Sequence, residues 1–154
     1  MEKEHMKLRY QNNAFTLTEL LVATLLLACL FSGVMVTFFR CLELSEVSNN
    51  STTAVLAAKS KLSEIENTDF SQISANYNNV SFNVADVNAK GVTYVTATSA
   101  DVLTISVVIC WKQSNGRVYG EDNNLNGTLN TGEDKNGNGQ LDSIVSLTTV
   151  KYDI

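Results

Sequence analysis

The first forty residues show the sharpest contrast of hydrophobic and polar positions in the chain. An apolar run of 25 residues, from Phe15 to Phe39, contains a single acidic or basic side chain, Glu19. About 20 apolar residues are enough for an α-helix to cross a bilayer. We therefore predict a transmembrane helix over residues 15–39. Its carboxylate needs an explanation, because an ionised group inside a membrane is costly.

The helical pattern continues beyond the apolar run. We expect one helix from Phe15 to Asn67, ended by the polar stretch NTDF. Its second part, residues 40–67, is amphipathic, and its small side chains suit close packing on a sheet. Apolar or small residues recur there at steps of three and four on one face: Leu44, Val47, Ser51, Ala54, Ala58, Leu62 and Ile65.

Residues 80–154 predict a small antiparallel sheet. The strongest strand signal is VLTISVVICWK, residues 102–112, because its alternate apolar side chains share one face. Trp111, on that face, is expected to anchor the core or an edge. Asn-Gly within Ser114–Arg117 predicts a hairpin turn. The other predicted strands are residues 80–84, 91–97, 117–120 and 143–154. The predicted fold is α+β, with one long N-terminal helix packed on four to five antiparallel strands.

Composition limits the classes of function. The chain has 154 residues and a net charge of −5, so the part beyond the apolar run can build one small core. Lys and Arg are few and scattered, and no nucleic-acid partner is expected. One of the three cysteines, Cys29, lies in the apolar run, which excludes a disulfide framework. A bridge between Cys41 and Cys110 stays open, but three unpaired thiols are favoured.

Residues 121–143, EDNNLNGTLNTGEDKNGNGQLDS, form a second informative stretch. With Asp122 as position 1, oxygen-bearing residues occupy positions 1, 3, 5, 7, 9 and 12 of an EF-hand calcium loop, and Gly127 occupies position 6. Calcium takes 6–8 oxygen ligands, and alternate side chains of a tightly turned loop point inward. The expected ligands are Asp122, Asn124, Asn126, Thr128 through its carbonyl, Asn130 and Glu133.

A second copy of this loop begins immediately afterwards. Its expected ligands are Asp134, Asn136, Asn138, Gln140 and Asp142. Position 12 is Val145, so either Asp142 compensates for the missing glutamate or Glu133 serves both sites. Leu129 and Leu141 occupy matching positions and are expected to pin the turns to the core. Uncharged Asn ligands predict weak affinity, about 10⁻⁴–10⁻³ M. A flexible Asn/Gly-rich loop is the alternative.

The apolar run can be compared with three kinds of N-terminal segment. A cleaved signal peptide has an apolar region of about 7–15 residues and a small-residue cleavage site, whereas this run is longer and no such site follows. A lipoprotein signal would use LLAC, ending at Cys29, but ten more residues of the run follow. A cut between Ala14 and Phe15 would place a new amine one helical turn from Glu19. That amine, on the same chain or a neighbour, would be the partner that Glu19 needs.

The stretch AFTLTELLVATLLLA, residues 14–28, resembles the cleavage and methylation segment of type IV prepilins and type II secretion pseudopilins. AAKSKLSEIENTDF, residues 57–70, is more weakly similar to the same family. The resemblance implies that residues 1–14 are a leader, cut after Ala14 by prepilin peptidase, and that Phe15 becomes N-methylated. Glu19 would pair with Phe15 of a neighbouring subunit. The chain departs from the family at Ala14, usually Gly, and in having no proline in the apolar helix.

By this resemblance the chain is expected to be a minor pilin or pseudopilin of a type IV pilus or type II secretion pseudopilus. Residues before the run include Lys3, Lys7 and Arg9, which keep that end cytoplasmic. Residues 40–154 would lie in the periplasm of a bacterium and later in the filament. Expected partners are other pilin or pseudopilin subunits, prepilin peptidase and the inner membrane, with calcium as cofactor. Such subunits often use calcium to fold a C-terminal loop.

Pilus and pseudopilus are not separated by the sequence. The alternative function is a monomeric membrane-anchored calcium-binding module or a lipoprotein. No enzyme is expected, since the single histidine, His5, lies in the leader and no catalytic arrangement is left without it.

Overall fold

A computed structural model describes residues 15–153 of the chain. It forms two compact units, one ending at Leu42 and one beginning at Glu43. Helix α1, Leu17–Glu66, begins in the first unit and ends in the second. Its bounds lie within two residues of the predicted helix, which is therefore confirmed as an element. The two units are described separately.

The first unit contains the apolar part of α1. Large apolar side chains are exposed all around this part; Leu30, for example, is 69% exposed. The hydroxyl groups of Thr24, Ser32 and Thr37 donate hydrogen bonds to carbonyls three or four residues earlier, so they leave no unsatisfied donor on the apolar surface. Among residues 15–153, α1 is the one helix long and apolar enough to cross a membrane.

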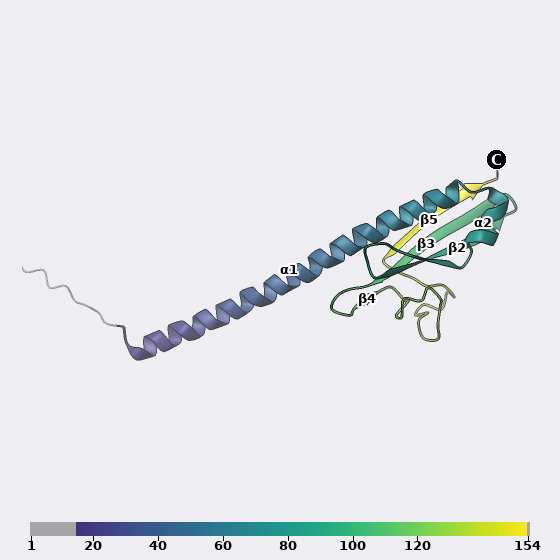
Figure 1. Ribbon diagram of the computed structural model, residues 1–154. Coiled ribbons are helices and arrows are strands. Elements are labelled where there is room, and N and C mark those ends of the chain that lie inside the picture. Colours follow the sequence, from purple (N-terminus) through teal and green to yellow (C-terminus); the bar gives the residue numbers. More distant parts are fainter. Residues whose placement is uncertain (1–14, 154) are drawn as a thin grey trace, which may run out of the picture. The chain divides into compact units, whose positions relative to one another are not determined.

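The second unit combines the end of α1 with a second helix and a five-stranded antiparallel sheet, seen in Figure 1. The sheet order is β1-β2-β3-β4, and β5 also pairs with β3. Along its second edge β3 pairs with β5 from Val102 to Ile109 and with β4 at Trp111 and Lys112. The elements are α2 Phe70–Tyr77, β1 Val80–Asn83, β2 Ala89–Ser99, β3 Val102–Lys112, β4 Val118–Tyr119 and β5 Val145–Tyr152. The predicted α+β fold is confirmed.

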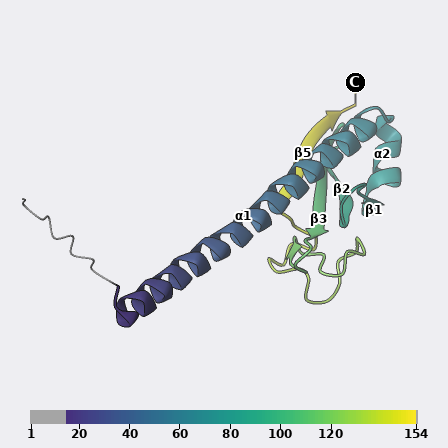
Figure 2. The same ribbon diagram turned by 60° about the vertical axis from the view of Figure 1, so that its left-hand side comes forward.

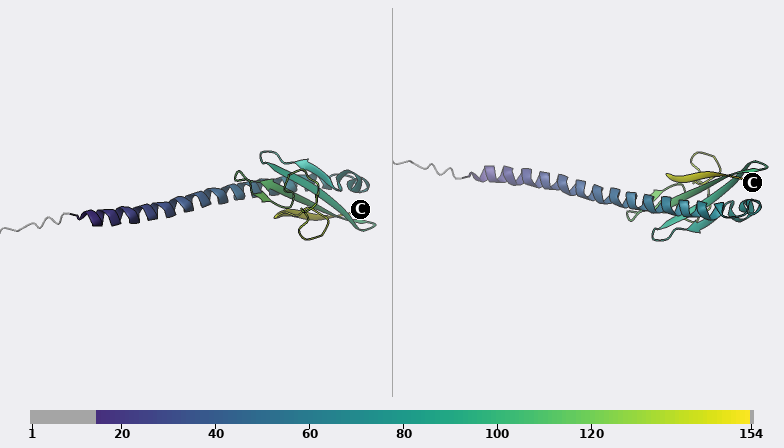
Figure 3. Two further views of the ribbon diagram at one scale, coloured as in Figure 1. Left: turned by 90° about the horizontal axis from the view of Figure 1, so that it is seen from below. Right: turned by 90° about the horizontal axis from the view of Figure 1, so that it is seen from above.

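The main core lies between the end of α1 and one face of the sheet. Figures 2 and 3 show the end of α1 running along the sheet. On the helix, Ala54, Ala58 and Ile65 are fully buried, and the small alanines bring the helix backbone close to the strands. Strand β3 contributes every second residue, as its alternation predicts. These β3 residues are Leu103, Ile105, Val107, Ile109 and Trp111, all buried.

The N-terminal end of the predicted helix face does not join the core: Val47 and Ser51 are half-buried outside it, and Leu44 is exposed. Leu44 is 68% exposed. At this level the helix meets the turn after β3 through polar groups. The Gln113 side chain donates to the Glu43 carbonyl at 3.3 Å, and both the N–H and the hydroxyl of Ser114 donate to Glu46 at 2.8 Å. The prediction for Leu44 was wrong because the apolar face of the sheet ends before this turn of the helix.

The turn between β3 and β4 occurs where Asn-Gly predicted it. The Gly116 N–H donates to the Gln113 carbonyl at 2.9 Å, and the Gln113 N–H donates to the Arg117 carbonyl at 2.9 Å. Only the glycine of the Asn-Gly pair has a positive φ, 86°. Gly116 therefore comes after a turn of ordinary, unprimed type, and its own positive φ forms the bulge that completes the hairpin. Trp111 beside it is fully buried, as predicted, and stacks on Tyr119.

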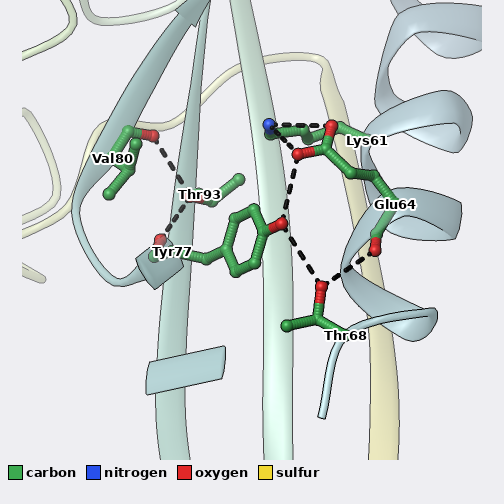
Figure 4. A network of polar contacts seen from close by, with 6 residues as sticks. All are labelled: Lys61, Glu64, Thr68, Tyr77, Val80 and Thr93. Atoms are coloured by element: carbon green, nitrogen blue, oxygen red, sulfur yellow. Dashed lines mark hydrogen bonds and ion pairs between the residues drawn. The ribbon is translucent and has the colours of Figure 1, made fainter. Parts of the chain in front are cut away.

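Helix α2 was not predicted from the sequence. Its apolar residues Phe70, Ile73 and Tyr77 pack in the main core, and Ile73 is fully buried there. Figure 4 shows the polar contacts that fasten it to α1: the Tyr77 hydroxyl donates to Glu64 at 3.1 Å, and Lys61 contacts the same carboxylate at 2.8 Å. The hydrogen bond from Lys61 is the main cause that lowers the pKa of Glu64.

The three cysteines are unpaired, so the favoured sequence interpretation is confirmed. Cys110 is buried on the sheet face opposite α1. A smaller core forms there from Val92, Tyr94, Val108, Cys110 and Leu141. Burial raises the pKa of the Cys110 thiol. Leu141 belongs to the loop between β4 and β5, and this loop therefore covers the second face of the sheet.

Thr93 on β2 provides a test of how α2 is held. It is fully buried, and its hydroxyl contacts the carbonyl oxygens of Tyr77 and, at 3.1 Å, Val80 (Figure 4). Thr93→Val should lower the free energy of unfolding by about 1–3 kcal/mol, because a buried hydrogen bond is lost and carbonyls lose their donor. Thr93→Ser keeps the hydroxyl and should cost about 1 kcal/mol for the missing methyl group. Urea unfolding of the detergent-solubilised chain measures both, and an equal or inverted order would contradict this role.

Candidate metal centre

The doubled loop, residues 120–144, joins two strands that share one edge of β3. Because β4 ends at Tyr119 and β5 begins at Val145 on the same edge, the loop leaves and returns at nearly the same place. The Glu121 N–H donates to the Asp142 carbonyl at 2.8 Å and closes the base of the loop. The loop lies beside β4 in Figure 1.

The loop is attached to the sheet through Leu141. This residue is fully buried, as predicted, and its N–H donates to the Tyr94 hydroxyl at 2.8 Å. Burial raises the pKa of Tyr94. The matching prediction for Leu129 was wrong, since that side chain is 36% exposed. Leu125 packs against the small core instead, because its positive φ of 56° turns the chain there.

The two copies of the loop make the same backbone contacts. In the first copy the Asp122 carboxylate accepts the N–H groups of Asn126 at 3.0 Å and Gly127 at 2.7 Å, positions 5 and 6. In the second copy Asp134 accepts those of Asn138 at 3.1 Å and Gly139 at 2.9 Å, again positions 5 and 6. The repeat seen in the sequence is therefore a repeat in three dimensions.

Backbone handedness repeats in the same way. Positions 4 and 6 both have positive φ, at 56° and 76° for Leu125 and Gly127 and at 74° and 75° for Gly137 and Gly139. The position-5 N–H donates to the position-3 side chain in both copies, from Asn126 to Asn124 and from Asn138 to Asn136, each at 3.0 Å. The two copies therefore follow the same succession of turns.

In the first copy the predicted ligands at positions 7, 9 and 12 come together. The Asn130 amide lies 3.0 Å from the Thr128 carbonyl and 3.1 Å from the Glu133 carboxylate. Glu133 also accepts the N–H groups of Asn123 at 2.9 Å and Asn130 at 2.9 Å, positions 2 and 9. Glu133 therefore closes the first copy, joining its end to its beginning.

In the second copy positions 3, 5 and 9 come together. The amides of Asn136 and Asn138 donate to one oxygen of Asp142 at 2.5 Å and 2.8 Å. The Gln140 N–H donates to the Asn138 side chain at 2.8 Å, as Thr128 does to Asn126 at 2.8 Å in the first copy. Both carboxylate oxygens of Glu133 accept N–H groups of the first copy.

Glu121 was not predicted from the sequence as a residue of this site, because the loop was counted from Asp122. Glu121 accepts the N–H groups of Lys135 at 3.0 Å and Asp142 at 3.1 Å, which are positions 2 and 9 of the second copy. The signal that could have found it is the dipeptide Glu-Asp, which occurs at residues 121–122 and again at 133–134.

Three carboxylates of the loop are buried without a cation. Glu121 is 7%, Asp122 0% and Glu133 5% exposed. None of the three makes an ion pair with a Lys or Arg within residues 15–153. Burial raises the pKa of Glu133, but hydrogen bonds from Asn130 and Asn123 outweigh this and leave the pKa below its ordinary value. Burying carboxylates without a Lys or Arg partner among residues 15–153 is costly.

The donor set restricts which metal could bind. Among the described residues no cluster of three or more His, Cys, Asp or Glu side chains is placed to hold a metal ion. A metal in the doubled loop would depend on carboxylate, amide and carbonyl oxygens together. Such an all-oxygen set suits calcium and does not suit zinc or copper.

The predicted processing and assembly residues lie apart from this loop in the sequence. Ala14 lies outside the described residues. Phe15 is 79% exposed, and Glu19 is in the first turn of α1, where its N–H is accepted by the Thr16 hydroxyl at 3.3 Å. Thr16 followed by Glu19 has the spacing of a capping box. No Lys or Arg among residues 15–153 pairs with Glu19.

The two matched glycines offer a test of the loop geometry. A Cβ on Gly127 would lie 2.4 Å from the Ser81 Cβ, whereas a Cβ on Gly139 would meet nothing within 4 Å. Both have positive φ, so Gly139→Ala should cost only about 1–2 kcal/mol for conformation. Gly127→Ala should cost more, because the loop must also move away from β1. Thermal unfolding monitored by Trp111 fluorescence measures both variants, and equal losses would contradict the packing of the first copy on β1.

No protein-family model, curated protein or solved structure matches this chain. Its function is therefore argued from two features of its own residues. One is the apolar part of α1 with a single carboxylate, Glu19. The other is the doubled loop with its buried carboxylates.

Proposed function

We propose that the chain is a structural subunit, a minor pilin or pseudopilin, of a type IV pilus or type II secretion pseudopilus. In this proposal prepilin peptidase cuts after Ala14 in the inner membrane of a bacterium, and the body is periplasmic before assembly. The observation that supports it best is an apolar helix surface that carries one carboxylate near its start, Glu19, which no Lys or Arg among residues 15–153 pairs with. A soluble protein would bury such a surface within itself.

The cost of the carboxylate supports assembly over simple anchoring. On insertion scales an acidic side chain at the centre of a membrane helix costs about 2.5–3.5 kcal/mol. An anchor alone gains nothing from this cost. A free amine on Phe15 of a neighbouring subunit would neutralise Glu19 and would also set the axial register between subunits. The apolar surfaces of adjacent helices would then form the filament core.

A local role for Glu19 has to be separated from this one. As the third residue after the helix cap, Glu19 also suits the positive end of the helix dipole. Gln satisfies a capping box nearly as well as Glu but has no charge. Glu19→Gln therefore removes the proposed ion pair and keeps most of the local role.

Calcium binding by the doubled loop is the second part of the proposal. The matched turns and the three buried carboxylates support it. An ion in the doubled loop would hold this loop in place over Cys110 and Tyr94 of the smaller core. The same loop would suit the alternative, a monomeric membrane-anchored calcium-binding module. The lipoprotein variant of that alternative is less well supported, because α1 continues as a helix through Cys29.

Processing and assembly can be tested on the chain recovered from its own membrane. We expect an N-terminus at Phe15 and a mass higher by one methyl group, measured by N-terminal sequencing and intact mass. Glu19→Ala and Glu19→Gln should both abolish filament assembly while expression and membrane insertion persist. A chain that retains Met1, or normal assembly of Glu19→Gln, would contradict the subunit proposal and favour a simple anchor.

Calcium binding can be tested separately through stability. If the dissociation constant is about 10⁻⁴ M, calcium at about 10 mM should stabilise the folded body by about 2.7 kcal/mol. Thermal unfolding with calcium, with excess chelator and with equal magnesium measures the effect. Magnesium should stabilise less, because it requires a smaller and more rigid octahedral site. Identical unfolding temperatures in calcium and chelator would exclude this part of the proposal.

A further inference from the structure

We propose that Glu121 is the closing glutamate of the second loop copy, so that the doubled loop binds two calcium ions. This inference rests on the proposed calcium binding and adds a ligand residue to it. Each copy would then be closed by the glutamate that stands directly before the first aspartate of the other copy. Glu133 precedes Asp134 and closes the first copy, and Glu121 precedes Asp122 and closes the second.

The second copy cannot obtain its closing carboxylate from its own end. Position 12 there is Val145, which is 5% exposed, belongs to the main core and begins β5. A bidentate glutamate at this position is what completes an EF-hand loop. The carboxylate must therefore come from another segment that reaches the same place.

Glu121 reaches that place because both ends of the loop lie on one edge of β3. Its carboxylate accepts the N–H groups of Lys135 at 3.0 Å and Asp142 at 3.1 Å. Glu133 accepts the N–H groups of Asn123 and Asn130, each at 2.9 Å. In both copies these donors are positions 2 and 9. The two glutamates thus occupy equivalent places. Glu133 is the last residue of the copy that it closes, whereas Glu121 lies in the chain before the copy that it contacts.

Burial and charge point to a cation at this place. Glu121 is 7% exposed, and no Lys or Arg of the described chain pairs with it. Two backbone N–H groups orient the carboxylate but do not cancel its charge. Asp142, which accepts the amides of Asn136 and Asn138, brings a second carboxylate to the same copy, and Asp134 a third.

The carboxylate count has a consequence for affinity. Counted by sequence, the second copy with Glu121 has three carboxylates, Glu121, Asp134 and Asp142, which the structure does not bring together as one cluster, and the first has two, Asp122 and Glu133. Calcium affinity in such loops rises with the number of charged ligands. If a bound ion draws these three carboxylates together, the second copy, which lacks a glutamate in its own sequence, is expected to bind at least as tightly as the first.

The test is calcium stoichiometry of the full chain in detergent, measured by equilibrium dialysis with radioactive calcium up to about 10 mM. Wild type should bind two ions. Glu121→Gln, which keeps shape and removes charge, should weaken one site at least about tenfold. Glu133→Gln should weaken the other site. Asp101→Asn, an exposed residue before β3, is the control with the same change of charge and should leave both sites unchanged.

Double variants assign Glu121 to its site. Glu121→Gln combined with Asp134→Asn should retain the first ion, because both changes fall in one site. Glu121→Gln combined with Glu133→Gln should lose both ions. If Glu121→Gln fails to fold, judged by Trp111 fluorescence, Glu121→Asp keeps the charge but shortens the side chain, and it should weaken the second site alone.

The outcomes separate this inference from the proposed function. Two ions in wild type and one strong site in Glu121→Gln would support the inference. Calcium binding that is unchanged in Glu121→Gln and in Glu121→Asp would overturn it and leave calcium binding by the first copy intact. No calcium binding by wild type would overturn the calcium proposal itself, and the inference with it.

Discussion

Strand β3 pairs along one edge with β2 and along the other with β5 and then β4, so its backbone hydrogen bonds hold three other strands in place. Its side chains alternate between two cores. Ile105, Ile109 and Trp111 face α1, whereas Val108 and Cys110 face the doubled loop. Everything else in the second unit is positioned relative to this strand. Where α1 presents small alanines to the sheet, the larger side chains of β3 fill the space between them.

The change of partner along β3 also creates the candidate metal centre. Pairing with β5 ends at Ile109 and pairing with β4 begins at Trp111, so the segment between β4 and β5 starts and finishes beside Cys110. Leu141 fixes that segment to the sheet. The carboxylates of Glu121 and Glu133 can then be buried against backbone N–H groups instead of extending into water.

Local patterns predicted the elements well, because periodicity reports which side chains share a face. Helix α1, the strong strand β3 and the turn at Gly116 follow from such patterns. The sequence-based predictions failed where contacts with residues distant in the sequence determined the structure. Leu44 has an apolar side chain at the right step, but the neighbouring turn offers it only polar groups. Helix α2 has only eight residues, so its helical spacing rests on just Phe70, Ile73 and Tyr77, and it is the packing of these three side chains in the main core that shows it to be a helix.

The sequence by itself determined that the chain has a membrane-type helix, a small sheet and two loop copies with calcium-ligand spacing, because all three are properties of residues close together along the chain. It identified the oxygen-bearing residues at odd positions, and the structure turns both copies in the same way. Only the tertiary structure decided which leucine meets the sheet and which carboxylate closes the second copy. Glu121 lies 14 and 21 residues before the N–H groups it contacts, and no local period relates them. They meet because β4 and β5 return the chain to the same edge of β3.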